Sequence, residues 1–86
     1  MPSPQAYDPV LSGRAAAFLT SLSKAKQRKV IELAFGLAEH PFQIGDYPTQ
    51  DATNRRLENI LLGEWHFTFW ADHAVREFRI TDITEV

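Results

Sequence analysis

The sequence predicts a single α+β domain, in which an N-terminal helical hairpin packs on one face of a small antiparallel sheet. Two patterns lead to this fold class. Apolar residues recur at helical spacing in the first half of the chain, and apolar and polar residues alternate after residue 54. Helices that precede strands are typical of α+β proteins, in which they cover one sheet face and leave the other open. With 86 residues, the chain has room for one small core.

The first residues are expected to contribute little to that core. Three of the five prolines lie within residues 1–9, and proline lacks the amide donor that a central strand needs. We therefore predict a frayed tail over residues 1–5 and one domain over residues 6–86. A short edge strand around Tyr7–Leu11 is the element expected before the first helix.

Two helices joined by almost no loop are expected next. Ser12 and Ser23 are suitable N-caps for them. The second helix must stop at His40, because Pro41 disfavours helical geometry in the residue before it. The buried side of the first helix carries apolar residues at helical spacing: Ala15, Phe18, Leu19 and Leu22. The second helix carries a similar stripe: Val30, Leu33, Ala34 and Leu37.

The segment 41–53 is rich in Pro, Gly, Asp and Thr and shows no periodicity, which predicts a long loop. Three strands should follow, over Arg56–Leu62, Glu64–Ala71 and Val75–Thr81, with turns at Gly63-Glu64 and Asp72-His73. One face of the middle strand is apolar: Trp65, Phe67, Phe69 and Ala71. Beside its other face, which carries His66, Thr68 and Trp70, we expect three residues of the last strand: Glu77, Arg79 and Thr81.

Composition excludes several classes of function. The chain has no cysteine, so it has neither disulfides nor thiolate chemistry. No histidines and carboxylates have metal-ligand spacing, and we expect neither a metal nor another cofactor. Nine basic and eleven acidic residues give a net charge of −2, which argues against binding driven mainly by phosphate. No apolar run is long enough to span a membrane, and the N-terminus does not resemble a signal peptide, so we expect a cytoplasmic protein.

His66 is the residue in the middle of the predicted sheet that can move a proton near neutral pH. With Glu77 or Glu58 across the strand and Arg79 nearby, it can form a general acid–base pair beside a phosphate ligand. The candidate catalytic residues are therefore His66, Arg79 and Glu77. The alternative is a histidine that is simply packed and hydrogen-bonded among aromatic side chains.

The start of the second helix is a candidate for binding nucleic acid or a partner protein. Four cations crowd it: Lys24, Lys26, Arg28 and Lys29. Cations at a helix N-terminus oppose the helix dipole, so a phosphate backbone or an acidic partner segment would explain them. The alternative is an ordinary solvated helix face.

Three further residues are candidates for binding. Arg55 and Arg56 can grasp a phosphate or carboxylate, or can protect the sheet from edge aggregation. Trp70 can stack on a base or anchor a peptide. The alternative to a binding role for Trp70 is burial of its side chain under the N-terminal segment or the long loop.

Several short segments together carry a resemblance to a known family. They are Val10-Leu11-Ser12, Leu37-Ala38-Glu39-His40-Pro41-Phe42 with Gly45-Asp46, Arg56-Leu57, Gly63-Glu64-Trp65-His66-Phe67-Thr68-Phe69, and Phe78-Arg79-Ile80-Thr81-Asp82-Ile83. In this order and spacing, over roughly residues 6–86, the chain resembles the RelE/ParE superfamily of toxins from bacterial type II toxin–antitoxin systems.

The resemblance implies a RelE/ParE-like fold and a toxin-like protein that a cognate antitoxin neutralises. RelE-type members cut messenger RNA in the ribosome, ParE-type members poison DNA gyrase, and the systems are associated with plasmid stabilisation. His66 stands where the family usually has an arginine on the central strand. A non-catalytic protein-binding module with the same fold is therefore the alternative, and a homodimer stays open.

Overall fold

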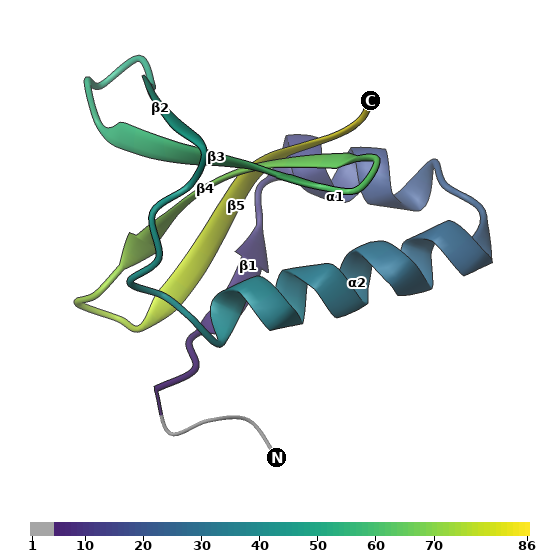
Figure 1. The fold of residues 1–86 in the computed structure, drawn as a ribbon, viewed down its shortest axis with the longest axis horizontal. Helices are drawn as coiled ribbons and strands as arrows, with labels where there is room; N and C mark the ends of the chain where they lie inside the picture. The colour runs from purple at the N-terminus through teal and green to yellow at the C-terminus, as the bar shows by residue number, and fades with distance from the viewer. Residues whose placement is uncertain (1–4) are drawn as a thin grey trace.

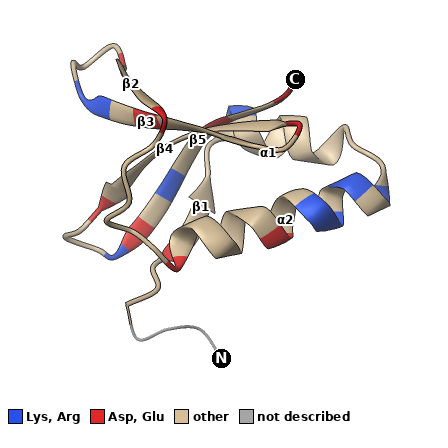
Figure 2. Cartoon of the chain, viewed as in Figure 1, with Lys and Arg blue, Asp and Glu red and all other residues tan. Residues whose placement is uncertain are grey.

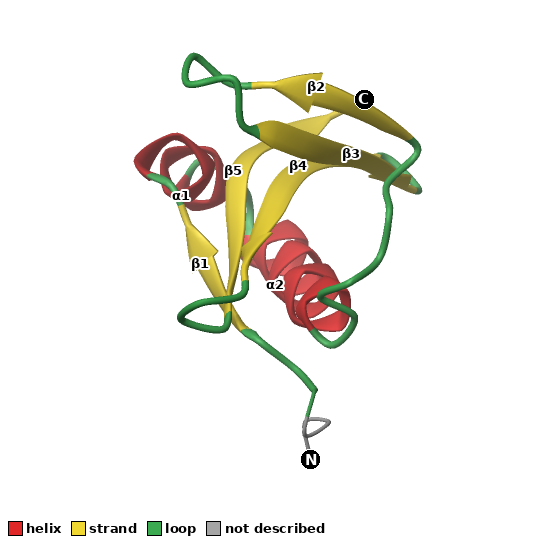
Figure 3. Cartoon of the chain, turned by 90° about the vertical axis from the view of Figure 1, so that its left-hand side faces the viewer, coloured by secondary structure: helices red, strands yellow, loops and turns green. Residues whose placement is uncertain are grey.

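The computed structural model describes residues 5–86, and two helices cover one face of a five-stranded sheet (Figures 1 and 3). The helices are α1 (Gly13–Thr20) and α2 (Lys24–Ala38). The strands are β1 (Asp8–Leu11), β2 (Tyr47–Gln50), β3 (Arg56–Leu62), β4 (Trp65–Asp72) and β5 (Glu77–Glu85), in the spatial order β1-β5-β4-β3-β2. The predicted α+β class and helical hairpin are confirmed. Most of the predicted tail, residues 1–4, lies outside the described residues.

Serine caps begin both helices, as the sequence predicts. The Oγ atom of Ser12 accepts a hydrogen bond from the amide of Ala15 at 3.1 Å and donates to the carbonyl of Thr81 at 2.7 Å. Ser23 accepts from the amide of Lys26 at 3.3 Å. The second bond of Ser12 ties the start of α1 to β5, so the cap also fixes the helical hairpin on the sheet.

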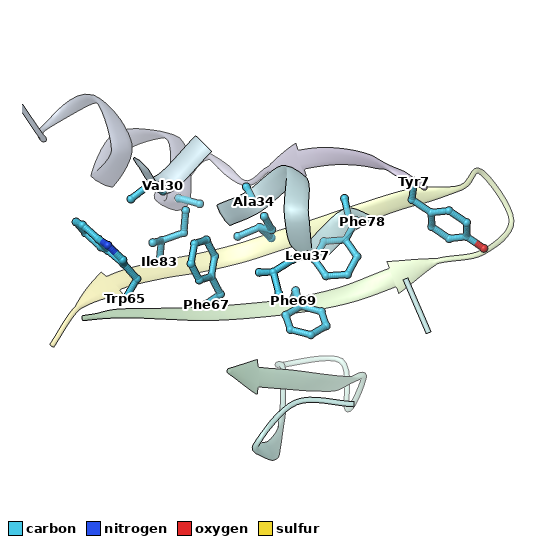
Figure 4. Packing of buried hydrophobic residues seen from close by; sticks show 12 residues of the cluster. Tyr7, Val30, Ala34, Leu37, Trp65, Phe67, Phe69, Phe78 and Ile83 are labelled. Carbon is cyan, nitrogen blue, oxygen red and sulfur yellow. The ribbon is translucent and has the colours of Figure 1, made fainter. Parts of the chain in front are cut away.

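The core lies between the helices and strands β4 and β5 (Figure 4). Phe67, Phe69 and Phe78 are at most 1% exposed and pack beneath α2. Phe67 and Phe69 confirm the apolar face predicted for the middle strand, and Phe78 belongs to β5. Burying an aromatic side chain of this size contributes about 2–3 kcal/mol, which makes these strands the centre of the domain.

The sequence predicts a loop over the whole segment 41–53, and this prediction is wrong for part of it, because the segment contains β2. This strand pairs antiparallel with β3 at the edge of the sheet. All four of its residues are exposed and one of them is Pro48, so the strand has no alternation of apolar and polar residues to recognise. Proline is tolerated there because edge strands leave amide positions unpaired.

The last strand is longer than predicted and begins later. It starts at Glu77 rather than Val75 and runs on to Glu85, past the expected end at Thr81. A register shift between Thr68 and Phe69 marks a bulge in its pairing with β4. The two adjacent polar residues Thr81 and Asp82 lie at this bulge, so they interrupt the alternation and disguise the second half of the strand.

The predicted N-terminal edge strand is confirmed as β1, which pairs in parallel with β5. The sheet is therefore mixed rather than purely antiparallel. Within the described part of the chain, no helix is long and apolar enough to cross a membrane.

Candidate functional site

The sheet face turned away from the helices, here called the open face, carries the polar residues that the sequence singles out. Alternation along β4 places His66, Thr68 and Trp70 on it. Cross-strand pairing adds Arg79, opposite Trp70, and Glu77, opposite Asp72. Asn59 of β3 pairs with Thr68 and so belongs to the same face.

The open face does not bring His66, Glu77 and Arg79 together as predicted. His66 lies opposite Leu61 and Thr84. Arg79 of β5 lies opposite Trp70, which is four residues further along β4 than His66. At about 3.3 Å per residue, the two positions are about 13 Å apart along the strand. The reason is the length and register of β5, which runs past His66 and places Thr84 beside it.

Glu58 is also not available to His66. It pairs with the buried Phe69, so its side chain lies on the helix side of the sheet. Arg56 donates to it at 2.7 Å and the amide of Gly45 at 2.9 Å. Burial would raise the pKa of this carboxyl, but the hydrogen bonds from Arg56 and Gly45 outweigh that effect and lower the pKa. Arg56 is therefore held at a strand end beside Glu58.

Instead of an acidic partner, His66 has a neutral hydrogen-bond network. Its Nε2 atom lies 3.0 Å from Oδ1 of Asn59 and 3.2 Å from the hydroxyl of Tyr47. Thr68 donates to the same Oδ1 at 2.8 Å. The half-buried imidazole is thus hydrogen-bonded to one residue of β3 and one residue of the edge strand β2. Because the sequence does not predict β2, it does not predict this contact. His66 is therefore hydrogen-bonded, as in the alternative interpretation of this residue.

Arginine side chains flank Trp70 at the other end of the open face. The guanidinium of Arg55 lies 4.0 Å from the centroid of the indole ring, and that of Arg79 lies 5.7 Å from it. Both distances are within the range of cation–π attraction. Arg55 therefore covers the half-buried Trp70, and a base could stack on the covered ring only after Arg55 moves.

Carboxylates hold both arginines of this cluster. Glu77 pairs with Arg79 at 2.6 Å, and Asp72 lies 3.6 Å from its Nε atom. That Nε is buried and has no hydrogen-bond partner. Asp51 pairs with Arg55 at 3.4 Å. The cations at this end of the open face are thus largely neutralised within the chain.

Asp51 organises the turn that presents Arg55. One of its oxygens accepts from the amide of Thr53 at 2.8 Å, from its hydroxyl at 2.7 Å and from the amide of Arg55 at 3.0 Å. These bonds, led by that of the Thr53 hydroxyl, lower the pKa of the Asp51 carboxyl. Asn54, which lies between Thr53 and Arg55, has a φ of 64°, and asparagine tolerates this value better than most residues.

The basic start of α2 is a separate surface, because α2 covers the other face of the sheet (Figure 2). Lys26 pairs with Glu85 of β5 at 2.9 Å, and its pKa is raised mainly by this hydrogen bond. Lys24, Arg28 and Lys29 are exposed and form no ion pair with the residues that the structure describes. Only Lys26, of the four predicted binding residues, therefore has a structural role.

Within residues 5–86, no three His, Cys, Asp or Glu side chains are grouped so that they could hold a metal ion. The candidate site is therefore the open face itself, with the His66 network at one end and the Arg55–Trp70–Arg79 cluster at the other.

No protein-family model matches the chain, and no curated protein matches it either. Solved structures do. A chain of the RelBE2 toxin–antitoxin complex from Mycobacterium tuberculosis superposes with a TM-score of 0.76 and 18% identity, over 94% of this chain and 99% of that one. The chain has the RelE fold.

Two further complexes contain a chain with the same fold. A chain of the archaeal RelE–RelB complex from Pyrococcus horikoshii OT3 has a TM-score of 0.64 and 18% identity, over 93% of this chain and 94% of that one. A chain of the intact RelBE complex of E. coli has a TM-score of 0.67 and 11% identity, over 94% and 98%. At such low identities the shared property is the RelE fold, which confirms the architecture that the sequence resemblance implies.

Proposed function

We propose that the chain is the toxin-like component of a type II toxin–antitoxin pair, neutralised by a cognate antitoxin protein. The observation that carries the proposal is the RelE fold over 94% of the chain. The similar structures are complexes of toxin with antitoxin, which supports a partner protein of that kind.

We further propose that the target is messenger RNA on the ribosome, which places the protein in the cytoplasm. RNA cleavage needs a base that takes the proton of a ribose hydroxyl, and cations that stabilise the charge developing on phosphate. His66 supplies the base. Arg79 and Arg55, about 13 Å along the strand, would contact neighbouring phosphates rather than the reacting one. In this arrangement Glu77 holds Arg79 and does not exchange protons with His66.

The experiment is induced expression in a bacterial host, with growth followed and with pulse-labelling of protein, RNA and DNA. We expect growth arrest in which protein synthesis fails first, and no arrest with His66→Ala. His40→Ala is the matched control, since His40 is exposed beyond the end of α2, and it should remain toxic. Arrest with DNA synthesis failing first would overturn the ribosomal target in favour of gyrase, and unimpeded growth at high soluble expression would overturn the toxin role.

One observation favours a second candidate, a non-catalytic RelE-fold module that binds another protein. Carboxylates of the chain already neutralise both arginines beside Trp70, and the net charge is −2. Such a face suits a protein partner better than RNA. This candidate predicts harmless expression, together with binding to the product of a neighbouring small open reading frame that His66→Ala leaves unchanged.

A further inference from the structure

Asn59 is a buried residue of the open face, and its side-chain amide is fully hydrogen-bonded. It is 2% exposed and is the one buried polar side chain among residues 5–86. Its Nδ2 atom donates to the carbonyl of Tyr47 at 3.3 Å and to Oγ1 of Thr49 at 2.9 Å. Its Oδ1 faces Thr68 and His66. Both donors and both acceptor sites of the amide are thus used.

This arrangement fixes which way round the amide lies. A backbone carbonyl can only accept a hydrogen bond, so the amide nitrogen must be the atom that faces Tyr47. The oxygen of Asn59 is then the atom that faces His66, and an oxygen can only accept. An Nε2 atom that carries the hydrogen can donate to this oxygen, whereas a bare Nε2 would place two lone pairs 3.0 Å apart.

The consequence reaches the other ring nitrogen of His66. In a neutral imidazole only one nitrogen is protonated, so Nδ1 keeps its lone pair and is the atom that can take a proton. Protonation of Nδ1 leaves the bond from Nε2 to Asn59 intact. The network therefore accommodates the neutral and the charged ring equally, as a base that gains and loses a proton requires.

We propose that Asn59 is a positioning residue, which holds His66 with Nε2 protonated and Nδ1 as the proton acceptor. The titratable side chain that the structure places against the ring is Tyr47. Its hydroxyl oxygen lies 3.2 Å from Nε2, so it can accept a share of the same hydrogen. The cross-strand neighbours, Leu61 and Thr84, carry no charge. The role of Asn59 in catalysis rests on the proposed RNA cleavage, whereas its effect on the ring does not.

The test is nitrogen-15 NMR of the imidazole rings in the whole protein, at alkaline pH, where the rings are neutral. We expect the His66 shifts of an Nε2-protonated ring in the wild type. Asn59→Leu should mix the two neutral forms, and the control Thr68→Val, which removes the other hydrogen bond to Oδ1, should keep the wild-type form. An Nδ1-protonated ring in the wild type would overturn the proposal without any variant, as would an unchanged ring in Asn59→Leu.

A second variant covers the case in which Asn59→Leu does not fold. Asn59→Asp keeps an acceptor for Nε2, so the Nε2-protonated form should persist in the same nitrogen-15 spectra. Mixed neutral forms in Asn59→Asp would contradict the proposal. A correct ring form in a protein that cleaves no RNA would overturn the proposed function alone and leave the role of Asn59 standing.

Discussion

Gly45 lies where a side chain has no room. A Cβ atom there would overlap the backbone oxygen of Asn59 and come within 2.8 Å of its nitrogen. We expect Gly45→Ala to push the segment off β3 and to lower the free energy of unfolding by about 1–3 kcal/mol. Chemical denaturation measures this.

Gly36 is the matched control for that substitution. It lies inside α2, and a Cβ atom added there would meet nothing within 4 Å, so Gly36→Ala should stabilise the protein by about 0.5–1 kcal/mol. Equal effects of the two substitutions would contradict the close approach at Gly45.

Glu58 gives the stability of the protein a pH dependence. Its folded-state pKa is lowered from the ordinary value of 4.5, so its contribution is complete above that pH. The contribution is lost as the pH falls through the folded-state pKa. We expect Glu58→Gln to cost about 1–2 kcal/mol at neutral pH and progressively less in acid. Denaturation curves across pH 2–7 would show the two proteins converging, and a constant difference would contradict the assignment.

The turn between β2 and β3 acts as a unit that places Arg55 over Trp70. Three hydrogen bonds to Asp51 hold it. We expect Asp51→Ala to release the guanidinium from the indole and to increase the quenching of Trp70 fluorescence by acrylamide. Trp65 is 2% exposed and should contribute little to that change. Quenching that matches the wild type would show that Arg55 stays over the ring without Asp51.

Which elements the sequence predicts depends on whether each element has a buried side. Both helices and β4 follow from periodicity, because their apolar faces enter the core. The edge strand β2 does not, since none of its side chains is buried. The second half of β5 is concealed by Thr81 and Asp82, where the bulge breaks the alternation.

The same limit applies to the site. Alternation alone places His66 and Trp70 on the open face, but neighbours across strands depend on register, which the bulge and the length of β5 alter. Asn59 could have been noticed as a polar residue in the run Leu57–Leu62. Its hydrogen-bond partners could not have been predicted, because Tyr47 and Thr49 belong to β2, which has no alternation of apolar and polar residues.

Taken as a whole, the molecule presents two independent surfaces, the open face and the basic start of α2. If the cations of α2 bind an acidic antitoxin segment, Lys24→Glu with Arg28→Glu should weaken antitoxin binding about tenfold or more and leave the toxicity of the free protein unchanged. Calorimetric titration and growth assays separate the two effects. Loss of toxicity with full antitoxin binding would show instead that these cations act on the target.

The most direct measurement is cleavage of messenger RNA on programmed ribosomes by the purified protein, mapped by primer extension. We expect the wild type to cut, His40→Ala to cut equally, and His66→Ala to be slower by about 10²–10⁴-fold, the usual contribution of a general base. Folded wild-type protein that leaves the message intact, or His66→Ala that cuts as fast as the wild type, would contradict a catalytic open face.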